Sequence, residues 1–206
     1  MKTYFTLAVG LLAAFVLWTA ALCMVDIQSI GPQGSAVGLA TMNQWFHRWT
    51  GVHMELYDLT DNISLIPLAL AAGFGLLGLC QWIQRKDLRK VDRSLLVLGG
   101  FYVVVLAAFI CFELAAINYR PILIEGRLEA SYPSSTTMLA LCILPTAAMQ
   151  LRARSCSRWI SGSLYGLTAF MIIARLFSGV HWLTDIIGGL LLSSGLVMLY
   201  KAMTEQ

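Results

Sequence analysis

The residues with the clearest chemical potential are an arginine, a histidine and an aspartate late in the chain. Five residues separate Arg175 from His181, and three separate His181 from Asp185. If a helix begins near His181, this spacing places His181 and Asp185 on one helical face. A carboxylate beside an imidazole fixes its tautomer and raises its basicity, as a nucleophilic histidine requires. Because arginine offers a planar fork to phosphate oxygens, the three residues favour a site that binds and attacks a phosphate group.

Two further clusters precede this group. Ser134, Ser135 and Thr136 follow a proline at the start of an apolar run, and the exposed N–H groups and positive dipole of a helix N-terminus there would suit a phosphate. Helix capping alone explains the same residues. Arg120-Pro121 is also open to two interpretations, since an arginine that ends a spanning helix can bind a phosphate or extend its side chain to the membrane surface.

The composition predicts an all-α integral membrane protein. Of the 206 residues, 58% are hydrophobic and 12% are charged, against about 45–50% and about 25% in soluble domains. This excludes a large soluble domain, a disordered chain, a disulfide-rich secreted module and a nucleic-acid-binding domain. We expect one domain over residues 1–206 with six transmembrane helices, near Tyr4–Val25, Ser64–Ile83, Ser94–Ala116, Thr136–Leu151, Ile160–Phe177 and Leu183–Tyr200.

The basic residues predict the orientation of these helices. Ten of the 14 lysines and arginines lie at the termini and in the second and fourth connections. By the positive-inside rule both termini face the cytoplasm, and the first, third and fifth connections face out. The outward connections hold only Arg48, Arg120, Arg127 and Arg175, so the candidate site lies on the extracytoplasmic side of a multi-pass protein in the cell membrane.

Two remaining features of the sequence carry less information. The connection Asp26–Asn62 contains Trp45 and Trp49, whose spacing suits a helix in the outer interface, either guiding a lipid or serving as an inert anchor. The five cysteines form no close pair and no zinc or haem pattern, so we interpret them as small apolar residues and expect no cofactor.

Taken in order, the three clusters resemble the signature of the type 2 phosphatidic acid phosphatase superfamily, the integral-membrane lipid phosphate phosphatases. That signature reads Lys-x6-Arg-Pro, Pro-Ser-Gly-His and Ser-Arg-x5-His-x3-Asp. The matching segments are Glu113-x6-Arg120-Pro121, Pro133-Ser134-Ser135-Thr136 and Ala174-Arg175-x5-His181-x3-Asp185.

The resemblance implies a role for each matched residue. His181 would be the nucleophile that forms a phosphohistidine, and Asp185 would orient it. Arg120, Arg175 and Ser134 would bind the phosphate, together with Ser135 and Thr136 at the same helix start. The family requires no metal, and its substrates are lipid phosphates and prenyl pyrophosphates.

Two positions depart from the family signature. Thr136 stands where the family has the histidine that protonates the leaving group, and Glu113 stands where it has a lysine. We expect Glu113 to pair with a neighbour such as Arg120, to turn away, or to be protonated and serve as a substitute acid.

The missing histidine favours a substrate with a good leaving group. Without an acid, expelling an alkoxide should cost about 10²–10⁴ in rate, whereas a phosphate leaving group, with a pKa near 6, needs little protonation. A lipid pyrophosphate such as undecaprenyl pyrophosphate is therefore favoured over phosphatidic acid or phosphatidylglycerophosphate. The alternatives are a pseudoenzyme that binds lipid phosphates without turnover, and a lipid transporter or scramblase. The oligomeric state stays open.

Overall fold

The computed structural model describes residues 2–204 of the chain. Apart from three isolated bridges, the regular structure in this range is helical, as the sequence predicts. The helices are α1 (Lys2–Met24), α2 (Ala40–Thr50), α3 (Met54–Ile63), α4 (Leu65–Arg85), α5 (Arg93–Ala115), α6 (Ser135–Ala153), α7 (Arg158–Phe177) and α8 (Leu183–Thr204), with the 3₁₀ turns η1 (Pro32–Gly34) and η2 (Leu88–Lys90).

Five candidate spans are long and apolar enough to cross a membrane: α1, the joined α3 and α4, α5, α7 and α8. The chain is therefore a multi-pass membrane protein. The helix predicted as the fourth crossing, α6, has 19 residues, but Gln150, Arg152 and several threonines make it more polar. Neighbouring helices bury Gln150 and the threonines, and 12 residues of α6 are buried in all, whereas α1 buries three of 23. Arg152, in the last turn, is exposed. The count of six crossings stays a prediction.

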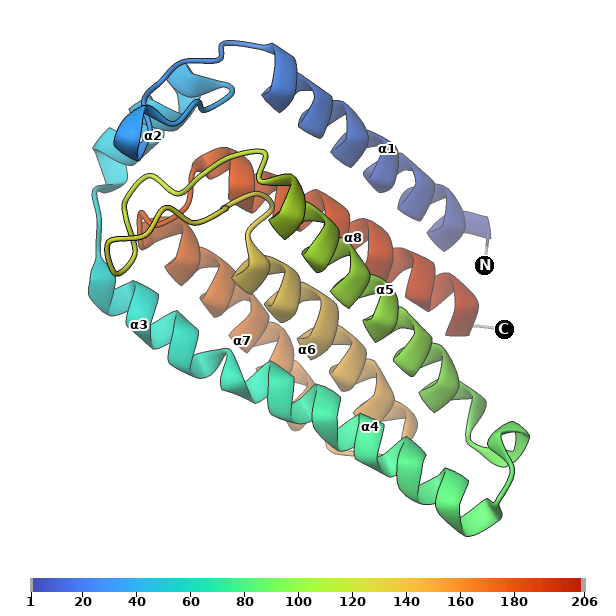
Figure 1. Cartoon of the computed structure of the whole chain (residues 1–206). Helices are drawn as coiled ribbons and strands as arrows, with labels where there is room; N and C mark the ends of the chain where they lie inside the picture. Colours follow the sequence, from blue (N-terminus) through green and yellow to red (C-terminus); the bar gives the residue numbers. More distant parts are fainter. Residues whose placement is uncertain (1, 205–206) are drawn as a thin grey trace.

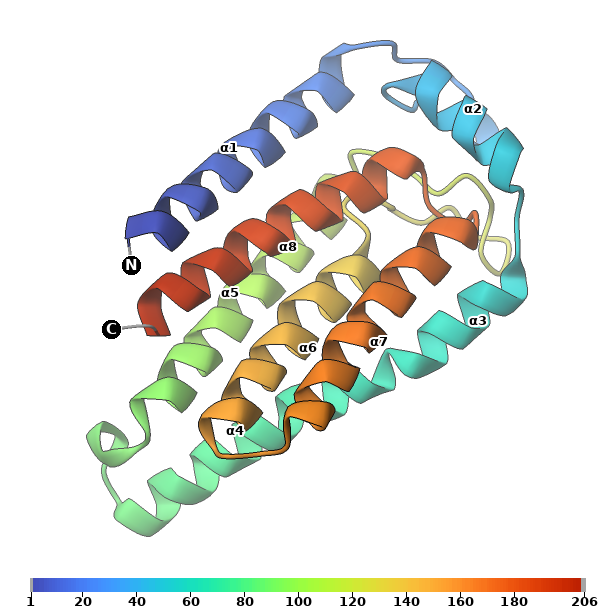
Figure 2. The same ribbon diagram turned by 180° about the vertical axis from the view of Figure 1, so that it is seen from behind.

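Helix α6 lies at the centre of the bundle. It packs against α4, α5, α7 and α8, and α1 lies along the outer side of α8. Figures 1 and 2 show these helices running roughly side by side, with α1 at one edge and the long α3–α4 segment at the other. Pro145 does not break α6, because helix interiors within a membrane bundle tolerate proline when neighbouring helices enclose the backbone.

Glycines on α8 allow close approach at two levels. A Cβ atom at Gly188 would lie 2.4 Å from the Tyr132 ring, and one at Gly195 would lie 2.8 Å from Leu12 on α1. Small residues at such contacts let helices pack closely in a membrane. Gly188 in particular allows the Tyr132 segment to lie directly against the first turns of α8.

The two ends of the bundle differ in content. Both termini lie at the same end as the α4–α5 and α6–α7 connections, and α2, α3 and the long α5–α6 connection gather at the opposite end (Figures 1 and 2). The three sequence clusters fall at this second end. Trp45 and Trp49 lie on helix α2, both about two-thirds exposed, and their place at the membrane interface stays a prediction.

Candidate active site

The connection between α5 and α6 folds back on itself and fixes Arg120. The Arg120 N–H donates to the Glu129 carbonyl at 3.0 Å, and the Ser131 N–H donates to the Asn118 carbonyl at 2.9 Å. The chain reverses between the two hydrogen-bonded halves of this connection, in a tight turn at Glu125 and Gly126, both of which have positive φ. The Glu129 carboxylate lies 3.0 Å from Arg120 Nε, so this side of the guanidinium is neutralised from within the same connection.

Arg175 reaches the same place from the last turn of α7. Its side chain is 2% exposed, and its Nη1 donates to Thr60 Oγ1 at 3.0 Å. The guanidinium lies 4.6 Å from the centre of the Tyr57 ring, which Arg120 also faces at 5.9 Å. Both arginines therefore contact helix α3. Arg175 Nε is buried without a hydrogen-bond partner among the described residues, and such a donor is suited to an anion.

A sharp reversal after α7 brings His181 back to the arginines. Gly179 makes this reversal with φ of 70°, and a Cβ atom there would lie 2.0 Å from the Gly51 carbonyl oxygen. His181 is 4% exposed, and Arg120 Nη1 lies 3.3 Å from its Nε2 atom. The structure thus brings Arg120, Arg175 and His181 to the same end of the bundle.

Asp185 lies in the first turn of α8, four residues after His181 and beside its imidazole. Its carboxylate is fully buried and accepts from Trp182 N at 2.9 Å and from Asn118 Nδ2 at 3.3 Å. Its Oδ2 atom lies 3.6 Å from His181 Nδ1. That separation exceeds a good hydrogen bond, and catalytic hydrogen bonds of this kind commonly tighten when substrate binds. Asp185 is held where it can orient the imidazole and stabilise positive charge on it.

The surroundings of His181 keep its imidazole neutral. Burial lowers the pKa of His181 well below its ordinary value of 6.5, and the positive charges of Arg120 and Arg175 lower it further. A neutral imidazole retains the lone pair that a nucleophile needs.

The three hydroxyl residues at the start of α6 divide into two groups. Ser134 caps the helix and is fully buried, with its Oγ accepting from Thr137 Oγ1 at 3.2 Å. Ser135 and Thr136 instead line the cavity that the arginines face. The hydroxyls placed to meet a ligand are therefore those of Ser135 and Thr136, and Ser134 acts as the helix cap.

One cavity joins the charged residues to an apolar space. It has a volume of about 490 Å³ between α4, α5 and α6. Arg120, Arg175, Asp61, Ser64, Ser135 and Thr136 form its polar lining. The remaining lining residues are almost all apolar, among them Leu68, Val105, Leu106, Phe109 and Leu139. This arrangement suits a ligand with an anionic head and a hydrocarbon chain.

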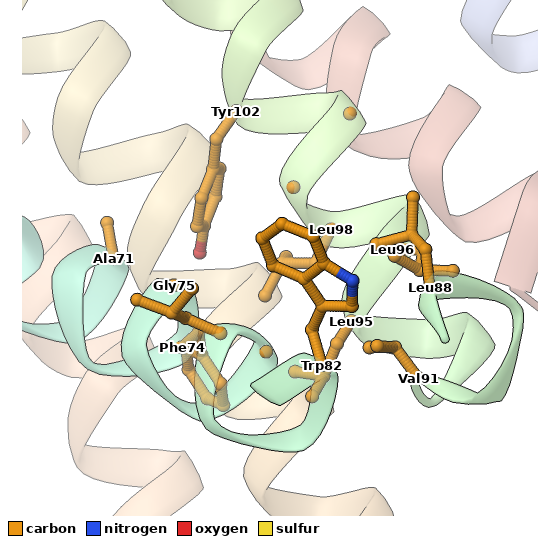
Figure 3. A pocket seen from close by; sticks show the side chains of 14 residues that line it. Ala71, Phe74, Gly75, Trp82, Leu88, Val91, Leu95, Leu96, Leu98 and Tyr102 are labelled. Carbon is orange, nitrogen blue, oxygen red and sulfur yellow. The ribbon is translucent and has the colours of Figure 1, made fainter. Parts of the chain in front are cut away.

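A second apolar cavity continues the first along α4 and α5. Its volume is about 350 Å³, and it shares Ala71 and Tyr102 with the cavity above. Figure 3 shows the Tyr102 ring beside it, with Trp82 on α4 facing Leu95 and Leu96 on α5. Together the two cavities extend along much of α4 and α5, and apolar side chains of these helices line them.

Glu113 does not join the site. Its side chain is exposed on α5, and it lines none of the cavities described above. Arg120 has Glu129 as its carboxylate partner. Of the three arrangements expected for Glu113, the structure has the one in which it turns away.

Sequence reasoning missed the contribution of α3. Tyr57, Thr60, Asp61 and Ser64 recur at positions that share one helical face, and this polar face was the available signal. It was overlooked because these residues precede the apolar run that marks the second crossing. Asn118 and Glu129, which support Asp185 and Arg120, lie in the α5–α6 connection and have no helical periodicity to identify them.

A model of one protein family matches the C-terminal part of this chain. Residues 113–206 match the model of the PAP2 superfamily, and these residues include all three sequence clusters. The resemblance to the type 2 phosphatidic acid phosphatase superfamily is thereby confirmed.

A solved structure shares the fold over nearly the whole chain. It is the crystal structure of a transmembrane PAP2-type phosphatidylglycerolphosphate phosphatase from Bacillus subtilis, similar at 21% sequence identity and a TM-score of 0.61, with 96% of each chain covered. A search of the curated proteins gave no match.

Proposed function

We propose that this protein removes a phosphate group from a membrane lipid, a lipid pyrophosphate in preference to a lipid phosphate, through a phosphohistidine at His181. The observation that carries the proposal is the joint placement of Arg120 and Arg175 at the polar end of a cavity whose other end is apolar, with His181 Nε2 directly behind Arg120. The site would face the extracytoplasmic side of the cell membrane, and residues 1–206 would act as one domain.

The first chemical step follows from these positions. The terminal phosphate binds between the two guanidinium groups and the start of α6, and its charge draws Arg120 Nη1 away from His181 Nε2. The Nε2 lone pair then attacks phosphorus as the bond to the bridging oxygen breaks, and the lipid leaves with that oxygen. Asp185, beside Nδ1, stabilises the positive charge that develops on the ring.

The preference for a pyrophosphate rests on Thr136. Its hydroxyl lines the cavity but cannot donate a proton near neutral pH, so the departing group must be stable without one. A lipid monophosphate leaves as a phosphate with a pKa near 6, whereas a lipid alcohol leaves as an alkoxide. The apolar end of this cavity and the neighbouring apolar cavity, which shares Ala71 and Tyr102 with it, would hold the hydrocarbon chain.

A binding protein without turnover is the second candidate. The same Thr136 substitution favours it, because the phosphate-binding arginines are present while the family's proton donor is replaced.

Purified protein in detergent tests the two candidates directly. Phosphate release would be measured from undecaprenyl pyrophosphate, phosphatidic acid and phosphatidylglycerophosphate, beside the His181→Ala variant. We expect fastest release from the pyrophosphate and none above background from the variant. Binding of these lipids without release by the folded wild-type protein would favour the second candidate and overturn the first.

A further inference from the structure

Asp61 is an acidic residue in an unusual place. It lies near the end of α3, within the candidate span Met54–Arg85. This 32-residue segment is longer than a membrane crossing needs, and its apolar part is α4, so Asp61 lies at the site end of the crossing. Asp61 also lines the cavity that contains Arg120, Arg175 and Thr136, and its Oδ1 atom lies 3.9 Å from Arg175 Nη2. It is the one carboxylate in the lining of that cavity, within the described residues.

The geometry of phosphoryl transfer defines where a second catalytic group must stand. The attacking and leaving atoms lie on opposite sides of the phosphorus atom. His181 is buried behind Arg120 and does not line the cavity. The lipid must therefore leave toward the cavity, and the water that later cleaves the phosphohistidine must attack from the cavity as well.

The groups available on the cavity side are few. Around the arginines, the lining offers the hydroxyls of Ser64, Ser135 and Thr136 and the carboxylate of Asp61. A hydroxyl does not accept a proton from water near neutral pH, whereas a carboxylate does. The other titratable lining residue, Tyr102, lies further along the cavity, where it contacts Thr146 at 3.2 Å.

We propose that Asp61 is the general base that activates water for hydrolysis of the phosphohistidine. This inference rests on the proposed function and supplies the group for its second step. Water transfers one proton to the Asp61 carboxylate as its oxygen bonds to phosphorus. The bond between phosphorus and His181 Nε2 breaks, its electron pair returns to the imidazole, and inorganic phosphate leaves. The side chain of Asp61 is 66% exposed, so the proton passes from it to solvent.

The contacts of α3 place Asp61 close to the proposed phosphate site. Arg175 holds the Asp61 carboxylate near the bound phosphate and offsets the repulsion between the two anions. Thr60, the neighbour of Asp61 on α3, accepts from Arg175 Nη1 and donates to a backbone carbonyl of its own helix, which fixes α3 against α7. Asp61 therefore stands on an element that is already tied to the phosphate site.

The test separates formation of the phosphoenzyme from its breakdown. Wild-type protein, Asp61→Asn and Asp61→Ala would be mixed with undecaprenyl pyrophosphate labelled with ³²P in the terminal phosphate. We expect Asp61→Asn to form labelled protein at close to the wild-type rate, to accumulate it, and to turn over about 10²-fold more slowly. Formate should restore part of the turnover of Asp61→Ala, because it supplies a carboxylate to the space that the substitution leaves.

Asp58→Asn is the matched control. Asp58 is exposed on the same helix three residues earlier and lines none of the described cavities, so this variant should behave as wild type. Equal losses of labelling and turnover in Asp61→Asn, without rescue by formate, would assign Asp61 a positioning role at Arg175 and overturn the proposal, as would unchanged turnover. A wild-type protein that neither becomes labelled nor releases phosphate would instead contradict the proposed function itself.

Discussion

Thr136 is the residue on which the substrate preference depends. The variant Thr136→His places an imidazole at the start of α6, on the wall of the cavity, where it can protonate a departing lipid oxygen. We expect kcat/KM for phosphatidic acid to rise by about 10²-fold or more, and that for undecaprenyl pyrophosphate to change little, because only the alkoxide leaving group needs the proton.

Thr136→Asn is the control for this substitution, since it adds a polar side chain that cannot act as an acid. It should leave the ratio of the two kcat/KM values near that of wild type. An equal rise for both substrates in Thr136→His would contradict the leaving-group argument.

His181 should remain neutral under conditions that protonate an ordinary histidine. Because its pKa is lowered by burial and by the two arginines, the ring should not take up a proton between about pH 8 and pH 6. Nuclear magnetic resonance of protein labelled at its three histidines would follow each ring, with the His181 signal assigned by its loss in His181→Gln. A His181 signal that titrates at or above pH 6.5 would show that the lowered pKa is wrong.

The lowered pKa of His181 also makes the folding stability depend on pH. A histidine whose pKa is lowered in the folded state binds fewer protons there than in the unfolded chain. Its contribution to stability is therefore complete above about pH 6.5 and declines as the pH falls below that value.

At the scale of single residues, the sequence indicated the charged residues of the candidate site better than the residues that hold them in place. Arg120, Arg175, His181 and Asp185 were identifiable because a membrane protein has few charges and these four have a recognisable spacing. The sequence left three arrangements open for Glu113, because a motif position does not say which way a side chain turns from α5, and the structure has the one in which it turns away. Asp61 could not be assigned to the site, since only the folded α3 brings it to Arg175.

At the scale of elements, the close contact between α8 and the α5–α6 connection has a direct test. Gly188→Ala would place a methyl group within 2.4 Å of the Tyr132 ring, which is 2% exposed and packed against Phe15. We expect a loss of about 1–3 kcal/mol in stability, because overpacking forces side chains or backbone to shift. Loss of phosphatase activity should accompany it, since Tyr132 lies two residues before the cap of α6.

Gly73→Ala on α4 is the matched comparison. A Cβ atom there meets nothing within 4 Å, so the melting temperature in detergent should be unchanged or slightly raised. If Gly188→Ala melts at the same temperature as Gly73→Ala, the contact at Tyr132 does not constrain the fold as described.

The hydropathy of the sequence predicted the apolar helices closely, but it did not predict the N-terminal extension of the second predicted crossing. The predicted segment Ser64–Ile83 begins ten residues after the structure's span Met54–Arg85. The additional residues form α3, whose charged and polar side chains resemble a loop in sequence. Thr60 and Asp61 contact Arg175 at the site, whereas Glu55 and Asp58 are exposed, and a hydropathy scan cannot detect either environment.

At the scale of the whole molecule, the separation of the two ends predicts the sidedness of the protein. In a variant without its five native cysteines, a single cysteine at Gly126 marks the site end, and one restored at Cys156 marks the α6–α7 connection. A membrane-impermeant maleimide applied to intact cells should label position 126 and not position 156, because the positive-inside rule predicts that the basic connections face the cytoplasm. Labelling of position 156 alone would reverse the orientation.

In the proposed reaction a single histidine, His181, carries the phosphate. The helical bundle places two arginines and a cavity with an apolar end beside it. The most direct measurement is the site of label after brief reaction of the protein with undecaprenyl pyrophosphate carrying ³²P in the terminal phosphate. Asp61→Asn, in which breakdown should be slow, would be the preferred background. We predict acid-labile, alkali-stable label on the peptide that contains His181, and none when His181→Gln is added. Phosphate release with no labelled peptide, or with label that survives the His181→Gln substitution, would contradict the account.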